Sequence, residues 1–274
     1  MSNKLKIIVV FFITSVAIFT ATKTHQENNS EFLIDKNVAA SSVVLNAAPP
    51  EEKPAETPAP NFYVAGQSAL ARELHGETVF YELNSRQRWP IASLTKLMTA
   101  VVALEKLGTT KEVSDLVKGM MLISSNEAAD QLATQHGQEN FVNAMNDKAR
   151  ELEMRQTSFF DASGLSFLNQ STVTDLYKLV NYITLKHPQV FQWSREKELM
   201  IGGLKYTNIN KFVGRKDFLG GKTGYTDEAS GNLISIFSTS KKPMLIIVLG
   251  APDKIERFEQ TKNLLEWISQ YYKL

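Results

Sequence analysis

The chain has 274 residues, of which 43% are hydrophobic and 22% charged, and its formal net charge is +1. This length suffices for one large domain or two small ones, and the balanced charge argues against nucleic-acid binding. The absence of cysteine excludes disulfides, thiolate metal sites and a cysteine nucleophile. The histidines are scattered without the spacing of a metal site, so we expect neither a metal nor another cofactor. They are His25, His75, His136 and His187.

The N-terminus has the pattern of an export signal. Lys4 and Lys6 precede an apolar run over residues 7–21, as a basic region precedes the hydrophobic region of a signal peptide. The run is shorter than the roughly 20 residues of a membrane-spanning helix. Phe19 stands where the cleavage motif requires a small residue, so a cleaved signal and an uncleaved anchor both stay open. We therefore expect residues 1–22 to be a signal peptide or an N-terminal membrane anchor, with the folded domain exported.

A proline-rich stretch separates this segment from the rest. Residues 23–61 are polar, then rich in alanine, and end with prolines interleaved with charged residues. Proline without a regular period is typical of an extended chain that forms no core. We expect this stretch to be a disordered linker that lets a folded domain, residues 62–274, stand off from a membrane. Only the N-terminal segment is then expected to contact that membrane.

The folded part shows strand patterns at both of its ends and helix patterns between them. Two short runs joined by a glycine turn predict an early β-hairpin, and two longer runs predict a late one. Apolar residues with helical periodicity dominate the middle and form the last stretch of the chain. The predicted strands cover residues 68–74, 78–83, 232–239 and 244–251. The predicted helices cover residues 113–123, 127–136 and 139–152; a further helix begins at Thr172, and the last one contains Phe258. This arrangement favours an α+β fold: one antiparallel sheet built from both ends, with flanking helices and a central helical insert.

Residues 90–108 predict a buried helix with a serine at its start. Ser93 lies near the helix N-terminus, where unpaired N–H groups and the positive end of the helix dipole lie, and Lys96 follows one turn later. An amine at that distance can accept the serine proton, which is the arrangement of an activated nucleophile. The same spacing recurs at Ser194–Lys197 and Ser238–Lys241. Taken alone, the first pair is equally a helix cap followed by a solvated lysine.

Two further motifs follow in order. Ser124 and Asn126 lie where one predicted helix ends and the next begins, and Lys222-Thr223-Gly224 occurs once, in a glycine-rich segment. Alone, the first pair is a helix cap, and the lysine protects an edge strand from aggregation. A second Ser-x-Asn, at residues 230–232, comes after the lysine motif, and we interpret it as a strand entry. Because Ser-x-Asn and Lys-Thr-Gly follow the first Ser-x-x-Lys in this order, we favour that pair over its two repeats as the nucleophile motif.

The ordered set Ser-x-x-Lys, Ser-x-Asn and Lys-Thr-Gly is that of class A β-lactamases and penicillin-binding proteins. From about residue 66 to the C-terminus, the chain resembles the serine D-alanyl-D-alanine carboxypeptidase family, the low-molecular-mass penicillin-binding proteins of peptidase family S11. The resemblance is carried by residues 91–100, 141–146, 157–159, 163–165, 207–210 and 221–229. It implies a β-lactamase/transpeptidase-like fold.

The resemblance implies a catalytic role for each residue of the first two motifs. Ser93 is then the nucleophile, Lys96 the base that accepts its proton, and Ser124 a shuttle that passes a proton to the leaving amine. Lys96 accepts a proton only when neutral, so we expect burial and the nearby charge of Lys222 to lower its pKa. Asn126 is expected to hold Lys96 and to bind the substrate backbone.

The third motif is implied to bind the substrate. Lys222 and Thr223 are expected to bind the terminal carboxylate, a free anion that carboxypeptidase substrates present at this place. Gly224 lets the strand backbone approach the substrate, which a side chain would obstruct. By resemblance, the oxyanion hole is formed by the backbone N–H groups of Ser93 and Tyr225.

These roles imply an exported bacterial serine D,D-carboxypeptidase that removes the terminal D-alanine from peptidoglycan stem pentapeptides, in the periplasm or on the outer face of the cytoplasmic membrane. β-Lactams are its implied covalent inhibitors. A D,D-endopeptidase that cuts peptidoglycan cross-links is the first alternative. A β-lactamase is disfavoured because the Glu-x-x-x-Asn loop of class A enzymes is not evident between residues 150 and 175. A non-catalytic peptidoglycan-binding envelope protein is disfavoured because a binder needs no nucleophile.

The chain departs from the family pattern in two places. Only 27 residues separate Lys96 from Ser124, where a strand-bearing insert is expected, so we predict that one wall of the cleft is missing or rebuilt. The chain also ends with the last predicted helix, without the β-rich second domain and amphipathic C-terminal anchor of many relatives. The endopeptidase branch of the family also lacks that domain. The oligomeric state and the cross-link chemistry of the substrate stay open.

Overall fold

A computed structural model describes the protein over residues 61–201 and 203–272. The predicted signal or anchor, residues 1–22, and the predicted linker up to residue 60 lie outside the described residues. Within the described part of the chain, no helix combines the length and the apolar character that crossing a membrane requires.

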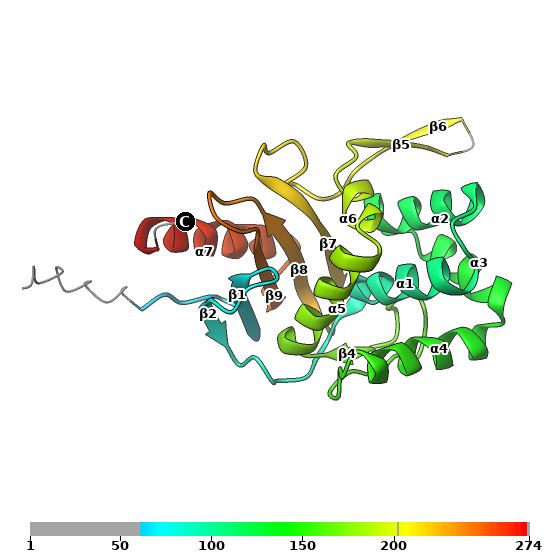
Figure 1. The fold of residues 1–274 in the computed structure, drawn as a ribbon, viewed down its shortest axis with the longest axis horizontal. Helices are drawn as coiled ribbons and strands as arrows, with labels where there is room; N and C mark the ends of the chain where they lie inside the picture. The colour runs from blue at the N-terminus through cyan, green and yellow to red at the C-terminus, as the bar shows by residue number, and fades with distance from the viewer. Residues whose placement is uncertain (1–60, 202, 273–274) are drawn as a thin grey trace, which may run out of the picture. The chain divides into compact units, whose positions relative to one another are not determined.

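Within the described residues, five strands form one antiparallel sheet with the order β2-β1-β9-β8-β7 (Figure 1). β1 and β2 form the predicted early hairpin, and β8 and β9 form the predicted late one. The first strand pairs with the last, so segments from both ends of the domain lie side by side, as predicted. The bounds are Ser68–Glu73 (β1), Val79–Leu83 (β2), Phe218–Thr226 (β7), Ser230–Phe237 (β8) and Met244–Ala251 (β9).

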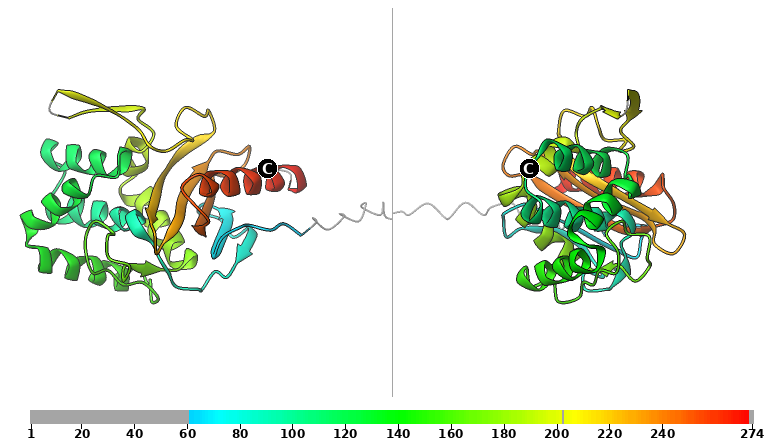
Figure 2. Two further views of the ribbon diagram at one scale, coloured as in Figure 1. Left: turned by 180° about the vertical axis from the view of Figure 1, so that it is seen from behind. Right: turned by 90° about the vertical axis from the view of Figure 1, so that its right-hand side faces the viewer.

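The helical part surrounds α1 (Lys96–Lys106), which follows a short 3₁₀ turn, η1 (Ala92–Thr95). All of α1 up to Leu104 is buried, and the helix contacts α2, α3, α4 and α5. Figure 2 shows these helices on one side of the sheet and α7 on the other. The bounds are Lys111–Leu122 (α2), Asn126–His136 (α3), Gln138–Glu151 (α4), Val173–Lys186 (α5), Gln189–Trp193 (α6) and Glu256–Tyr271 (α7).

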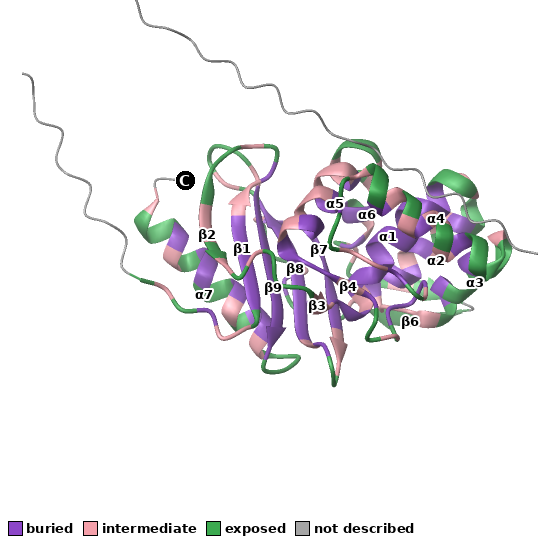
Figure 3. Ribbon diagram, turned by 90° about the horizontal axis from the view of Figure 1, so that it is seen from below, coloured by how far each residue is buried: buried purple, intermediate pink, exposed green. Residues whose placement is uncertain are grey.

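The sheet is buried on both faces because alternate side chains of each strand meet a different layer. On β9, Leu245 and Ile247 belong to the core shared with the helical part, whereas Ile246 and Val248 belong to the core shared with α7. Figure 3 shows the central strands as buried along their length. Burial on both faces explains why the sequence of β9 is one uninterrupted apolar run.

Local capping fixes where several helices begin. Thr110, Ser125 and Thr172 each accept a hydrogen bond from a backbone N–H in the first turn of α2, α3 and α5, respectively. The helix predicted to begin at Thr172 is therefore confirmed, with Thr172 as its cap. The Ser-Ser-Asn junction is a helix cap through its middle serine, Ser125, which leaves the residues on either side for other contacts.

The sequence patterns do not predict the shortest elements. β3 (Trp89–Pro90) pairs with β4 (Gln170–Ser171), and β5 (Glu198–Ile201) pairs with β6 (Leu204–Thr207). Elements of two to five residues, α6 included, are too short for periodicity to carry a signal. β6 in addition exposes every residue, so no burial imposes an alternation of apolar and polar side chains on it.

Candidate active site

Ser93 lies in the turn η1, and Lys96 is the first residue of α1. The turn brings the two side chains together: Nζ of Lys96 donates a hydrogen bond to Oγ of Ser93 over 3.1 Å. Ala92, directly before the serine, has a φ of +46°, a conformation that residues other than glycine rarely adopt. Such backbone persists only where its surroundings hold it, and it clusters at functional sites.

Lys96 is fully buried, and its amine contacts two further oxygens. Nζ donates to Oδ1 of Asn126 over 2.7 Å and to the backbone carbonyl of Ser163 over 2.5 Å. The amine is therefore held between the nucleophile turn, the start of α3 and the loop that precedes β4. The contact expected between Asn126 and Lys96 is present.

A second buried amine approaches from the sheet. Lys222, in the middle of β7, is 1% exposed, and its Nζ donates to Oγ of Ser124 and to the carbonyl of Thr223, each over 2.8 Å. Ser124 lies between α2 and α3 with a φ of +58°. Because Ser124 and Asn126 are two residues apart, one short segment contacts both the lysine of the sheet and the lysine of α1.

Burial lowers the pKa of both lysines. It lowers the pKa of Lys96 to about 8, although the charges of three carboxylates act in the opposite direction. Burial also lowers the pKa of Lys222 well below its ordinary value, and the positive charges of Lys96 and Arg257 lower it further. Burial is thus the largest cause of the lowered pKa at both amines, and repulsion between the two lysines contributes at Lys222. The three carboxylates are those of Asp161, Asp130 and Glu127.

β7 lies directly against the nucleophile turn. A Cβ atom on Gly224 would lie 2.8 Å from the carbonyl oxygen of Ile91 and 3.3 Å from the backbone nitrogen of Ser93. A side chain here would push the strand and the turn apart, so glycine allows this close contact between the two backbone segments. Thr223 is buried and Tyr225 half-buried, on either side of this contact.

A loop to which the motifs assign no role supports the site from the other side. The carboxylate of Asp161 accepts hydrogen bonds from the N–H groups of Ser163 and Gly164, which orients the Ser163 carbonyl toward Lys96. Gly164 has a φ of +85°, and a Cβ atom on it would lie 2.0 Å from the carbonyl oxygen of Ala92. This segment contributes to the family resemblance, but only the fold brings it to the nucleophile turn.

Two buried polar side chains tie the sheet to the site. Arg257, at the start of α7, donates from Nη1 to the carbonyl of Gly224 over 2.7 Å. Asn232, in β8, donates to the carbonyl of Pro90 over 3.0 Å and accepts from the N–H of Gly250 over 2.8 Å. Sequence reasoning misses both contacts. The one available signal is a polar residue within an apolar strand, at Asn232, close to the predicted strand entry that β8 confirms.

The two other Ser-x-x-Lys pairs lie outside the site. Ser194 is buried, and its Oγ donates to the carbonyl of Phe191 and accepts from the N–H of Gly221, which fastens α6 to β7. Ser238 lies in an exposed turn and donates to the carbonyl of Asp217. Both serines therefore have structural hydrogen bonds to backbone groups.

The site is built from hydroxyl, amine and amide groups. Among the described residues, no group of three or more His, Asp or Glu side chains is placed to hold a metal ion. A hydroxyl in contact with a buried amine of lowered pKa, beside a strand and a turn that can offer backbone N–H groups, is suited to acyl transfer.

The sequence and fold match a known family. The sequence pattern of the D-alanyl-D-alanine carboxypeptidases, Peptidase_S11, matches residues 53–112 and 106–253. A D-alanyl-D-alanine endopeptidase from Pseudomonas aeruginosa is 30% identical over 241 residues, which cover 75% of this chain and 77% of the relative. The D-alanyl-D-alanine carboxypeptidase DacA of Haemophilus influenzae is 28% identical over 242 residues, which cover 74% of this chain and 62% of that protein.

Among solved structures, penicillin-binding protein D2 from Listeria monocytogenes, in its cefotaxime-bound form, is similar with a TM-score of 0.70 at 29% identity. The similarity covers 76% of this chain and 98% of that one. The molecule therefore has the α+β fold of the penicillin-binding proteins, the β-lactamase/transpeptidase-like fold predicted from the sequence. The chain belongs to peptidase family S11, the serine D-alanyl-D-alanine carboxypeptidases.

Proposed function

We propose that this protein is a serine D,D-carboxypeptidase that removes the terminal D-alanine from peptidoglycan stem pentapeptides through an acyl-enzyme on Ser93. The observation that carries the proposal is a chain of contacts across the site. Lys96 donates hydrogen bonds to Ser93 over 3.1 Å and to Asn126 over 2.7 Å, and Lys222 donates one to Ser124 over 2.8 Å. Membership of family S11 supports the same activity.

In the first step, Oγ of Ser93 attacks the carbonyl carbon of the penultimate D-alanine while Lys96 takes the hydroxyl proton. The amine is within hydrogen-bond reach, and its lowered pKa of about 8 leaves part of it neutral near neutral pH. The peptide C–N bond then breaks. The leaving amine takes its proton through Ser124, whose hydroxyl accepts a hydrogen bond from Lys222.

The lysine motif holds the end of the substrate. The Lys222 amine and the Thr223 hydroxyl bind the terminal carboxylate, and this counter-charge favours the protonated form of the buried lysine. The backbone N–H groups of Ser93 and Tyr225 stabilise the oxyanion of the tetrahedral intermediate. Gly224 packs against the nucleophile turn, so the strand segment that carries the Tyr225 N–H lies next to the turn that carries the Ser93 N–H.

Water completes the reaction by attacking the ester carbonyl. Its oxygen joins the acyl carbon, one of its protons passes to Oγ of Ser93 as the ester bond breaks, and the shortened peptide is released. A β-lactam is opened by the same attack, but its amine stays tethered to the acyl group, so we infer that β-lactams inhibit this protein covalently. The similar penicillin-binding protein D2 is described in cefotaxime-bound and ampicillin-bound forms, which supports this inference.

A D,D-endopeptidase that cuts peptidoglycan cross-links is the second candidate. The alignments include this activity, because the Pseudomonas endopeptidase is 30% identical to this chain and the Haemophilus carboxypeptidase 28%. The same catalytic residues serve both reactions, since the two substrates differ only in the group that carries the leaving amine.

We further propose that the enzyme acts outside the bacterial cytoplasm, in the periplasm or on the outer face of the cytoplasmic membrane. The basic and apolar pattern of residues 1–22 and the cell-wall substrate support this location. Cell fractionation with an antibody to the folded domain checks it, and recovery of the protein in the cytoplasmic fraction alone would contradict it.

A fluorescent penicillin tests the assignment of the nucleophile. We expect covalent labelling of the wild type and none of Ser93→Ala. Ser238→Ala, which alters an exposed Ser-x-x-Lys repeat, serves as the matched control and should label like the wild type. Labelling of Ser93→Ala at the wild-type level would refute the assignment.

Three activity measurements separate the candidate functions. Release of D-alanine from a synthetic pentapeptide identifies a carboxypeptidase, and cleavage of a cross-linked dimer identifies an endopeptidase. A protein that binds the peptides but cuts neither is a non-catalytic binder. Rapid turnover of nitrocefin identifies a β-lactamase. We expect slow release of penicillin because residues 150–175 contain no Glu-x-x-x-Asn motif.

A further inference from the structure

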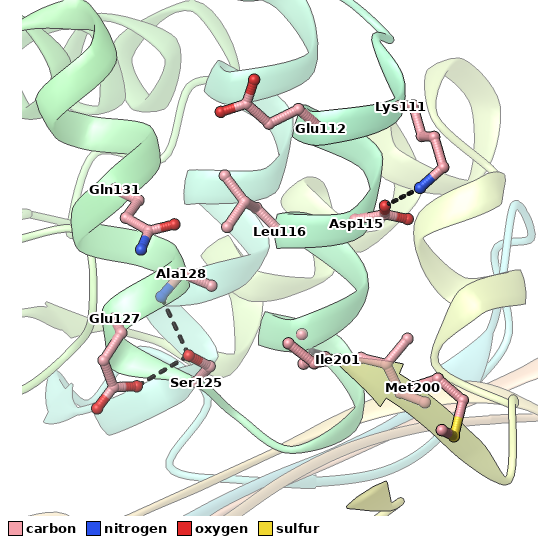
Figure 4. Close-up of a pocket in the computed structure, with 12 residues that line it drawn as sticks. Lys111, Glu112, Asp115, Leu116, Ser125, Glu127, Ala128, Gln131, Met200 and Ile201 are labelled. Atoms are coloured by element: carbon pink, nitrogen blue, oxygen red, sulfur yellow. Dashed lines mark hydrogen bonds and ion pairs between the residues drawn. The ribbon is translucent and has the colours of Figure 1, made fainter. Parts of the chain in front are cut away.

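The three oxygens that accept hydrogen bonds from Lys96 are positioned in different ways. Ser93 lies in the turn directly before the lysine, and Asn126 is the first residue of α3. The start of α3 is held by its cap, because Oγ of Ser125 accepts an N–H of the first turn over 3.0 Å (Figure 4). The third acceptor, the carbonyl of Ser163, lies in the loop between α4 and β4, outside any helix or strand. Other contacts must therefore fix its position.

Asn169, the residue directly before β4, holds this loop from within. It is fully buried, and its Oδ1 accepts the N–H of Phe160 over 2.6 Å and that of Asp161 over 3.3 Å. Its Nδ2 donates to the backbone carbonyl and to Oδ1 of Asp161, each over 3.2 Å. One amide therefore joins the two ends of the loop, and its burial makes the loss of these partners costly.

Asp161 connects Asn169 with the catalytic base. The carboxylate of Asp161 accepts the N–H of Ser163 over 2.8 Å and that of Ser166 over 2.7 Å, so the loop folds around it. The carbonyl of Ser163 in turn accepts a hydrogen bond from Nζ of Lys96 over 2.5 Å. Asn169 thus positions one acceptor of the base through a single intermediate side chain.

Asn169 also contacts the nucleophile turn. Its Nδ2 donates to Oγ1 of Thr95, a fully buried residue between Ser93 and Lys96 in the chain, over 3.3 Å. The two N–H groups of this amide are thus shared among three oxygens. The backbone carbonyl of Asn169 accepts the N–H of Ile91 over 3.0 Å. Because Ile91 and Thr95 stand at opposite ends of η1, the residue that holds the loop also holds both ends of the turn.

We propose that Asn169 is a positioning residue for the acylation step, which keeps the nucleophile turn and the Ser163 carbonyl in a fixed relation. The inference rests on the proposed serine D,D-peptidase function and adds a residue that acts through others. On one side Asn169 acts through Thr95, and on the other through Asp161.

The geometry that Asn169 maintains is that of proton transfer. In acylation, the proton of Ser93 moves to Nζ of Lys96 as Oγ bonds to the substrate carbonyl carbon, and the two atoms are 3.1 Å apart. The turn sets the position of Oγ, and the Ser163 carbonyl helps to set that of Nζ. A shift of the turn against the loop therefore slows the step even when every reacting group is present.

The same shift changes the pKa of Lys96. Burial lowers this pKa, and the charge of Asp161 opposes the effect of burial. The Ser163 carbonyl also favours the ammonium form, because it accepts a hydrogen bond from it. When the loop moves away, both contributions weaken and the pKa of Lys96 falls. The other charged groups that face Lys96 are Asp130 and Glu127 of α3 and Lys222 of β7.

The pH dependence of labelling by a fluorescent penicillin, measured on the full-length protein, tests this inference. Asn169→Ala is expected to slow labelling about tenfold or more, because the turn and the loop lose their common partner. It should also move the rising limb near pH 8 to lower pH by a few tenths of a pH unit, because the pKa of Lys96 falls. A purely structural role would lower the melting temperature and leave the limb in place.

Asn146→Ala is the matched control. Asn146 bonds the start of the same loop with both amide atoms: Nδ2 donates to the carbonyl of Phe159 over 2.8 Å, and Oδ1 accepts its N–H over 3.0 Å. Within the described residues, its other hydrogen bond stays in α4. The substitution should lower the melting temperature, keep the labelling rate constant within about twofold of the wild type and leave the limb in place.

Thr95→Val provides an independent arm that keeps Asn169 in place. Valine has a shape close to that of threonine but cannot accept the N–H of Asn169. We expect labelling to slow about threefold, the effect of part of one neutral hydrogen bond. The limb should stay in place, because Asp161 keeps its bonds to Asn169. Thermal unfolding identifies an Asn169→Ala protein that fails to fold, in which case Thr95→Val decides.

The outcomes separate this inference from the proposed function. Labelling of Asn169→Ala at the wild-type rate, a limb that it moves to higher pH, or equal effects of Asn169→Ala and Asn146→Ala would overturn the inference. Where Asn169→Ala does not fold, wild-type labelling of Thr95→Val would overturn it. A wild type that takes the label but cuts neither the pentapeptide nor the dimer would refute the proposed peptidase function and leave the positioning role in acylation standing.

Discussion

At Lys96, desolvation and hydrogen bonding oppose each other. The amine is bonded to the Ser93 hydroxyl, the Asn126 amide and the Ser163 carbonyl, all of them neutral oxygens. Neutral acceptors compensate an ammonium less than a carboxylate in contact would, so burial prevails and the pKa falls to about 8. A base in this range is neutral in useful fraction and still strong enough to take a serine proton.

Acylation should therefore accelerate as the pH rises through about 8, because Lys96 then loses its proton. The charge of Asp130 raises the pKa of Lys96, so Asp130→Asn is expected to move the rising limb to lower pH by a few tenths of a pH unit. The measurement is the pH dependence of the rate constant for labelling by a fluorescent penicillin. Asp147→Asn, on the exposed part of α4, should leave the limb in place. A limb that Asp130→Asn moves to higher pH would contradict the role of Lys96.

At the scale of elements, the nucleophile turn η1 is held between two segments that are far apart in the sequence. Gly224 of β7 contacts the turn at Ile91 and Ser93, and Gly164 contacts it at Ala92. Each approach is close enough to exclude a Cβ atom. The left-handed backbone of Ala92 is thus fixed by packing from both sides, and so is the position of the serine hydroxyl.

Gly164→Ala and Gly108→Ala form a matched pair that isolates this packing. Both glycines have nearly the same φ, +85° and +81°, so alanine adds about 1–2 kcal/mol of backbone strain at either position. At Gly108 a Cβ atom meets nothing within 4 Å, whereas at Gly164 it overlaps the Ala92 carbonyl. We expect Gly164→Ala to lower the free energy of unfolding by more and to slow penicillin labelling about tenfold or more. Thermal unfolding and labelling kinetics check both effects, and equal behaviour of the two variants would contradict them.

At the scale of the whole molecule, the site lies where the sheet meets the helical part. The strand β7 brings Lys222, α1 brings Lys96, and the segment between α2 and α3 brings Ser124 and Asn126. Two apolar cores, one on each face of the sheet, hold these elements in register. The hydrogen bonds of the site all join residues of the unit that begins at Thr57.

A protein that begins at residue 57 should therefore keep the site. We expect it to be labelled by fluorescent penicillin with a rate constant within about twofold of the full-length protein, because none of the contacts that orient Ser93 or Lys96 is removed. The comparison uses purified full-length and shortened proteins at equal concentration. Loss of labelling in a shortened protein that still unfolds cooperatively would show that the N-terminal residues contribute to the site.

The local features of the chain were predictable from residues close together in the sequence. The helices, the two hairpins and the cap at Thr172 follow from periodicity, turn residues and capping, which act over a few positions. The contact between Ser93 and Lys96 belongs with these, because one helical turn brings residues three apart together. The order of the three motifs was enough to indicate the family.

Tertiary structure alone decided how the distant segments meet. The bonds of Lys222 to Ser124 and of Lys96 to the Ser163 carbonyl join residues 98 and 67 positions apart, and no local preference specifies such distances. The backbone contact of Gly224 and the hydrogen bonds of the buried Asn232 and Arg257 also join residues that are far apart in the sequence. The reason is physical: periodicity records which face of an element is buried, whereas the partner on that face is chosen when the sheet and the helices pack together.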